Sequence, residues 1–151
     1  MRRDHDDITA LLYTYAERID AGDFAGVADL LAEAALTFEG FDVVRRGRTE
    51  VMAVYEATTR RHTDGTPRTK HVVTNVVLDI DGDAGTARSR SYFTVLQAVP
   101  GALTLQPVVA GRYRDGFRRV DGVWRFESRH ITVDLAGTLE HHLIGEPLRE
   151  R

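Results

Sequence analysis

Cysteine is absent from this 151-residue chain. Disulfides, thiolate nucleophiles and cysteine-ligated metals are therefore excluded, and a reducing compartment is the default expectation. Long apolar runs are also absent: the opening stretch MRRDHDDITALL offers none long enough for a signal peptide or a membrane span. These absences predict a cytoplasmic protein that has no membrane partner.

An excess of positive charge is lacking too, since the net charge is −3. The basic stretch RRHTDGTPRTK has no interleaved aromatic residues, so it is typical of a solvated loop and not of a nucleic-acid site. The sequence contains no G-x-S-x-G, Walker, G-x-G-x-x-G or H-E-x-x-H pattern. His141 and His142 are adjacent but make only a weak metal candidate. Because the cofactor motifs named above are also missing, we expect neither a metal nor another cofactor.

What is present begins with helical signals. Asp4, Asp6 or Asp7 can cap a first helix that Gly22 ends. Its apolar residues recur at helical spacing and form one face: Ile8, Leu11, Leu12, Tyr15 and Ile19. Shorter helices are predicted over about 24–32 and within 48–61, where Tyr55 is one of the inward positions.

The second half of the chain is predicted to be β-structure. Two short strands surround Gly40, and four long strands follow, over 69–80, 86–99, 103–120 and 123–135, separated by turn signals such as Asp121-Gly122. Helices that precede an antiparallel meander indicate an α+β fold, with the helices on one face of a curved, mostly antiparallel sheet that encloses a pocket. We expect one domain over 1–151, with a core over 1–135 and a polar tail, a loop or short helix, over 136–151.

Three segments carry a resemblance to a known family: YAERIDAGDFAGVADLLAEAALTFEG, RTKHVVTNVVLDIDGDAGTARS and GRYRDGFRRVDGVWRFESRHI. In this order and spacing they resemble the nuclear transport factor 2-like superfamily of α+β cones. That superfamily includes SnoaL-type polyketide cyclases, scytalone dehydratase, bile acid 7α-dehydratase and hexachlorocyclohexane dehydrochlorinase. The resemblance implies a cone-shaped fold around a pocket, whereas function varies widely on such folds.

One residue pattern is similar to the dehydratase and dehydrochlorinase branch. It combines Tyr-x4-Asp at the end of the first helix, Tyr15 and Asp20, with a histidine at the start of the first long strand, His71. The resemblance implies that His71 is a general base, that Asp20 orients it, and that Tyr15 assists the leaving group or a substrate oxygen. From the residues alone, the favoured readings are a core tyrosine for Tyr15 and a structural histidine for His71, and the alternative for Asp20 is a solvated carboxylate at the helix end.

Five further residues are candidates for substrate contacts: Asn75, Arg112, Tyr113, Arg129 and His130. Side chains alternate along a strand, so Asn75 is expected on the same face as His71, and either Arg112 or Tyr113 faces the pocket. His130 faces the pocket if the last strand is regular, whereas a β-bulge would turn Arg129 inward instead. The alternative for Arg112 and Arg129 is a salt bridge on the outer face.

The resulting functional hypothesis is a cofactor-independent lyase of the dehydratase type, acting on a small, largely apolar cyclic or polyketide-like molecule. The same residues could serve a polyketide cyclase or an isomerase. A non-catalytic binding domain or a scaffold subunit is the alternative from another class. The late strands hold more apolar residues than one concave face needs, namely Leu103, Leu105, Val108 and Val109, so we expect a homodimer.

Overall fold

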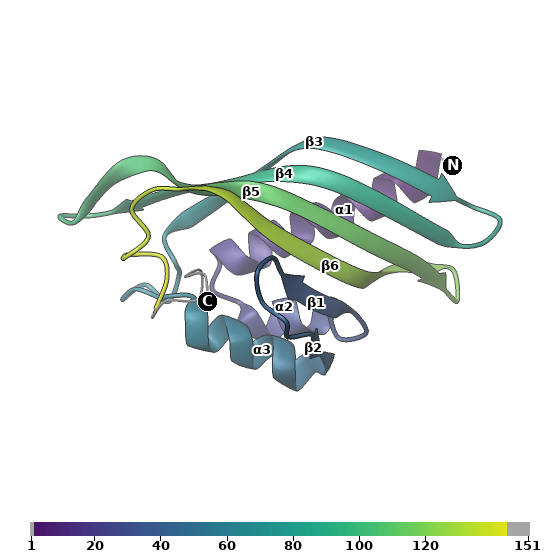
Figure 1. Ribbon diagram of the computed structural model, residues 1–151, viewed down its shortest axis with the longest axis horizontal. Helices are drawn as coiled ribbons and strands as arrows, with labels where there is room; N and C mark the ends of the chain where they lie inside the picture. The colour runs from purple at the N-terminus through teal and green to yellow at the C-terminus, as the bar shows by residue number, and fades with distance from the viewer. Residues whose placement is uncertain (1, 145–151) are drawn as a thin grey trace.

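A computed structural model describes residues 2–144 of the chain and consists of three helices and one sheet (Figure 1). The helices are α1 (Arg2–Asp20), α2 (Phe24–Leu30) and α3 (Gly47–Thr58). The strands are β1 (Ala35–Phe38), β2 (Arg45–Arg46), β3 (Thr69–Asp81), β4 (Thr86–Val99), β5 (Leu103–Val120) and β6 (Val123–Ala136). This α+β architecture confirms the predicted fold class and the four long strands.

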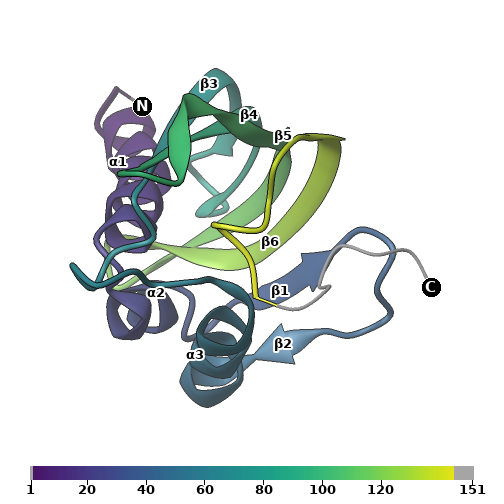
Figure 2. The same cartoon turned by 90° about the vertical axis from the view of Figure 1, so that its left-hand side faces the viewer.

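The sheet has six strands in the order β2-β1-β6-β5-β4-β3. Strands β3 to β6 form an antiparallel meander, and β1 adds to β6 in parallel. The sheet remains open, with β2 and β3 at its edges. Figure 2 shows that it curves strongly, so that its concave side faces the helices.

The core lies between this concave side and the helices. The predicted apolar face of α1 is buried at Ile8, Leu12, Tyr15 and Ile19. The sheet supplies inward side chains such as Phe93, Val95, Phe117 and Phe126, each at most 5% exposed. Burying one side chain of this size contributes about 1.5–3 kcal/mol, so packing on the sheet, not helix propensity, fixes the position of α1.

Several boundaries differ from those predicted. Helix α1 already extends to Arg2, so the predicted aspartate caps lie within the helix, and Asp4 instead accepts a hydrogen bond from the Trp124 indole at 2.9 Å. Within 137–144 the tail is a loop with a turn and one isolated bridge, between Leu143 and Thr59. The remainder of the predicted tail, 145–151, lies outside the described residues.

None of the helices within residues 2–144 combines the length and apolar character needed to cross a membrane.

Candidate functional site

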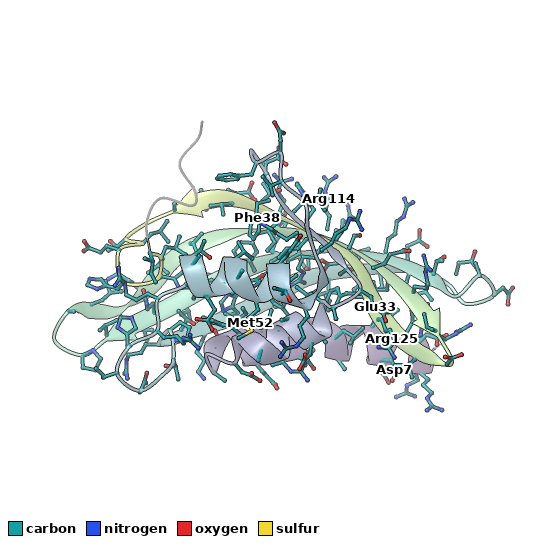
Figure 3. The ribbon with its side chains drawn as sticks, turned by 90° about the horizontal axis from the view of Figure 1, so that it is seen from below. Asp7, Glu33, Phe38, Met52, Arg114 and Arg125 are labelled. Atoms are coloured by element: carbon teal, nitrogen blue, oxygen red, sulfur yellow. The ribbon has the colours of Figure 1, made fainter. Side chains whose placement is uncertain are left out.

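A cavity of about 300 Å³ lies between α1, α3 and the concave face of the sheet. In Figure 3, seen from the helical side, α1 and α3 lie in front of the sheet that forms the cavity's far wall. The lining is mostly apolar and includes Phe38, Phe93, Val95, Val109, Ile131 and Val133. Val43 both lines the cavity and is 45% exposed, which places an opening at the loop between β1 and β2.

His71 lines the cavity and forms a largely buried pair with Asp20. The Nδ1 atom of His71 lies 2.6 Å from Oδ1 of Asp20, and the two side chains are 7% and 10% exposed. Two further donors hold the carboxylate: the backbone N–H of His71 at 2.8 Å and the hydroxyl of Thr69 at 2.8 Å. Asp20 is therefore fixed in place, and its proximity to Nδ1 fixes the orientation of the imidazole.

The local sequence explains this placement. Asp20 is the last residue of α1 and Thr69 the first of β3, so the carboxylate at the helix end lies against the start of the strand. A carboxylate at a helix C-terminus is unfavourable against the helix dipole. Burial raises the pKa of Asp20, but hydrogen bonds and charge from His71, together with the Thr69 hydroxyl, outweigh burial and hold that pKa below its ordinary value.

Tyrosine hydroxyls form the second polar group of the cavity. The Tyr15 hydroxyl, from α1, hydrogen-bonds the Tyr55 hydroxyl, from α3. Tyr113, from β5, packs edge-on against Tyr15 at 5.8 Å and stacks on Phe93 at 4.5 Å between ring centroids. Burial raises the pKa of each of these phenols, so all three remain protonated and able to donate hydrogen bonds near neutral pH.

Arg129 lies behind these rings, fully buried, and does not line the cavity. Its guanidinium makes two hydrogen bonds to Asp115, at 2.8 and 3.0 Å, and both side chains are 0% exposed. The guanidinium carbon lies 3.7 Å from the ring centre of Tyr113 and 4.1 Å from that of Tyr15. Burial lowers the pKa of Arg129, but Asp115 more than compensates and raises it above its ordinary value, so the cation persists beneath the tyrosines.

A β-bulge decides between the two predicted candidates on the last strand. Gly116 pairs with Ser128 and Phe117 with Phe126, so Glu127 is an extra residue in β6. The shift turns Arg129 inward, as the bulge alternative predicted. His130 lies on the outer side, where its ring nitrogens meet the Thr37 hydroxyl at 2.7 Å and Glu39 at 2.8 Å.

The structure places two other candidates away from the cavity. Arg112 makes a bidentate salt bridge to Asp134 at 2.9 Å on the outer face, as its alternative reading predicted. Asn75 is exposed at a second bulge, between Thr74 and Val77 of β3, with a left-handed φ of 55°. The expectation that Asn75 shares a face with His71 does not hold, because the bulge interrupts the alternation between them.

Tyr55 and His142 line the cavity, although the sequence did not assign either of them to the catalytic or substrate-binding site. Tyr55 was predicted to face inward, and only its hydrogen bond to Tyr15 makes it a member of the site. His142 comes from the polar tail, where no periodic pattern signals burial. The structure brings together the predicted Tyr15, Asp20, His71 and Tyr113 with these two residues.

His142 is 6% exposed, and its ring centre lies 6.3 Å from that of His71. Its Nδ1 atom is buried and has no hydrogen-bond partner among the described residues. Burial, the neighbouring His71 and His62 lower the pKa of His142 to about 4, against an opposing effect of Asp20. His142 is therefore a neutral imidazole at physiological pH.

We expect the buried state of His142 to make the folded protein sensitive to mild acid. Between pH 6.5, the ordinary pKa of histidine, and pH 4, the unfolded chain takes up a proton here that the folded protein refuses. The free energy of unfolding should therefore decrease by about 3 kcal/mol as pH falls through this window. The lowered pKa of Asp20 adds acid sensitivity only below this window.

Urea unfolding at several pH values between 4 and 7 measures this effect. The variant His142→Gln should have a flatter profile, whereas His141→Gln, which changes the 25% exposed neighbour, should keep the wild-type slope. An unchanged slope in His142→Gln would assign the acid sensitivity to other groups.

Within residues 2–144, no group of three or more His, Cys, Asp or Glu side chains is arranged to hold a metal ion.

Comparison with known structures agrees with this fold. A nuclear transport factor 2-like protein with a cystatin-like fold from Novosphingobium aromaticivorans superimposes with a TM-score of 0.71 at 23% identity, covering 90% of this chain and 84% of the other. A candidate scytalone dehydratase from the same organism gives 0.69 at 18% identity, covering 89% and 86%. ActVI-ORFA from Streptomyces coelicolor gives 0.69 at 20% identity, covering 86% and 96%.

No curated protein sequence matches the chain. The family model of the SnoaL-like domain, in contrast, matches residues 1–130, which is most of the chain and includes every strand through the first half of β6. With its nuclear transport factor 2-like fold, the chain belongs to the SnoaL-like domain family.

Proposed function

We propose that this protein is a cofactor-independent lyase of the dehydratase type that acts on a small, largely apolar cyclic molecule. The observation that carries the proposal is the Asp20–His71 pair, held at 2.6 Å with His71 on the wall of a mostly apolar cavity. An oriented imidazole beside a cavity is the arrangement that general-base catalysis requires. A purely ligand-binding domain needs the cavity but has no need of the pair.

The pair defines the base. The Asp20 carboxylate accepts a hydrogen bond from Nδ1–H of His71, which leaves the lone pair of Nε2 free to take a proton. In a β-hydroxy ketone, Nε2 removes a proton from the carbon between the carbonyl and the hydroxyl-bearing carbon. Asp20 stabilises the imidazolium that forms.

The tyrosines supply the acid. The Tyr15 phenol donates to the departing hydroxyl or to the developing enolate oxygen, and Tyr55 donates to Tyr15 in turn. The departing hydroxyl takes the phenol proton and leaves as water, and a carbon–carbon double bond conjugated to the carbonyl forms. The proton that His71 took from the substrate then passes to the Tyr15 phenolate, so both residues return to their starting protonation states.

The cavity indicates the class of substrate. Its volume of about 300 Å³ is at the lower end for small-molecule sites, and its walls are mainly aliphatic and aromatic side chains. A flat molecule of one or two rings with few oxygens fits this lining. The relationship to a candidate scytalone dehydratase is consistent with this class but, at 18% identity, extends to the fold alone.

Polyketide cyclisation is the second candidate, supported by membership of the SnoaL-like family. It begins with the same proton abstraction next to a carbonyl and uses the same residues. The two reactions differ in whether the enolate expels a hydroxyl or attacks a second carbonyl. The nature of the substrate, not the base, therefore separates them.

A direct test uses 3-hydroxy-1-tetralone, a bicyclic β-hydroxy ketone whose dehydration yields fluorescent 1-naphthol after tautomerisation. We expect the protein to accelerate the appearance of 1-naphthol over buffer, and Tyr15→Phe, which keeps the ring and removes the hydroxyl, to be slower. Incubation in D₂O adds a second readout, since removal of the α-proton incorporates deuterium even where elimination is slow. A protein that catalyses neither reaction on β-hydroxy ketones of this size would contradict the proposal.

A further inference from the structure

The segment after β6 is fastened across one end of the cavity. Its backbone is hydrogen-bonded to the end of α3 and the chain just after it. The N–H of Arg60 donates to the carbonyl of His142, and that of Ile144 to the carbonyl of Thr58, at 2.8 and 2.9 Å. The side-chain amide of Gln97, fully buried on β4, donates to the carbonyl of His141 at 2.8 Å. These bonds place the segment 139–144 as a fixed wall of the site.

This wall contributes one polar side chain to the cavity, that of His142. The ring is 6% exposed, and its Nδ1 is left without a partner among residues 2–144. This Nδ1 is sealed from solvent, so a ligand in the cavity meets the ring through its other nitrogen, Nε2. The ring lines the cavity and its centre lies 6.3 Å from that of His71, which places a hydrogen-bonding group beside the base.

We propose that His142 is a substrate-binding residue, a neutral imidazole that hydrogen-bonds the carbonyl oxygen next to the carbon from which His71 removes the proton. This inference deepens the proposed function and rests on it for the identity of that carbonyl. The assignment leaves the Tyr15–Tyr55 pair for the departing hydroxyl. His71 then acts on the carbon next to the carbonyl, and His142 on the carbonyl oxygen, from two different walls of the cavity.

The charges around the ring suit this role. The groups that act on His142 are His71, Asp20 and His62, and they include only one carboxylate, which is already bound by three donors. When His71 takes the substrate proton, the neighbouring imidazolium disfavours a second positive charge on His142. A neutral imidazole can polarise a carbonyl in this way without competing for the proton.

Two bicyclic probes test the inference by binding alone: 1-tetralone, which has a carbonyl, and tetralin, which is the hydrocarbon of the same shape. We expect the wild type to prefer 1-tetralone. His142→Phe, which keeps an aromatic ring and removes both nitrogens, should lose about tenfold in affinity for 1-tetralone and keep its affinity for tetralin. His142→Gln, which restores an amide donor, should recover part of the preference.

The control is His141→Phe. The neighbouring side chain changes, while the His141 carbonyl, which Gln97 and His62 bind, is retained. This variant should bind both probes as the wild type does. In the wild type, ¹⁵N spectra should show the ring nitrogens of His142 shifting with 1-tetralone and not with tetralin, a readout that does not depend on whether the variants fold.

Equal losses for both probes in His142→Phe would show a role in packing alone and overturn the inference, as would a wild type without preference for 1-tetralone or without the ¹⁵N shift. Failure of the lyase proposal looks different. The carbonyl preference and its dependence on His142 would then persist in a protein that neither dehydrates 3-hydroxy-1-tetralone nor exchanges its α-proton.

Discussion

His71→Ala should reduce the rate of α-proton removal and elimination by about 10²–10⁴-fold, the usual contribution of a general base. The expected loss follows from the position of His71 on the cavity wall, fixed by Asp20 at 2.6 Å. The fold should survive, because the backbone N–H of residue 71 and the Thr69 hydroxyl still bind Asp20. Steady-state turnover of 3-hydroxy-1-tetralone measures the loss, and circular dichroism measures the fold.

His130→Ala is the matched control. His130 also contacts a carboxylate, Glu39, at 2.8 Å, but on the outer side of the sheet and away from the cavity. It should keep wild-type turnover. If His71→Ala also keeps full activity, then His71 is structural and the base is another group.

Asp20→Asn complements this pair of variants. An amide at this position can present its NH₂ group to Nδ1 and so favour the tautomer with the proton on Nε2, which cannot act as a base. We therefore expect impaired turnover in a folded protein, with substrate affinity affected less than kcat.

Asp115→Ala should lower the free energy of unfolding by about 3–5 kcal/mol, because it leaves the Arg129 cation buried without its counter-ion. Both side chains of this pair are 0% exposed, and one guanidinium nitrogen, Nη1, already lacks a partner among the described residues. Urea unfolding followed by tryptophan fluorescence measures the loss, with Trp124 as the single reporter.

The control is Asp134→Ala, which removes the partner of Arg112 in an ion pair whose side chains are each 40% exposed. Solvent screens such a pair, so the expected cost is at most about 1 kcal/mol. The double variant Asp115→Leu, Arg129→Met should lose much less than Asp115→Ala, because it removes both charges together. If Asp115→Ala costs no more than Asp134→Ala, the buried cation has found another partner or solvent.

The parts of this structure that the sequence predicts are those governed by local rules. Alternation and turn signals located the four long strands, and helical spacing located the buried face of α1. The Asp20–His71 pair was predicted from a family pattern and not from geometry, because the two residues are 51 positions apart and only the docking of α1 on β3 joins them.

What the sequence left open depends on single irregularities and on distant contacts. The bulge at Asn75 moves that residue off the face of His71, and the bulge at Glu127 decides between Arg129 and His130, so neither placement could be made from spacing alone. His142 lies in a segment without periodicity. Hydrogen bonds from Gln97 to the His141 carbonyl and from the Arg60 N–H to the His142 carbonyl place this segment in the site. Such long-range bonds leave no local pattern.

The extra residue at Glu127 also affects how this strand should be aligned with those of its relatives. A relative whose last strand is regular needs one residue fewer to bring its side chains to the same places, so a correct alignment carries a one-residue gap at 127. Without that gap, Arg129 is aligned with a surface position of the relative. The buried arginine beneath the tyrosines then seems to have no counterpart there. Descent within this family is therefore traced more safely by superimposing β6 residue by residue than by counting along the sequence.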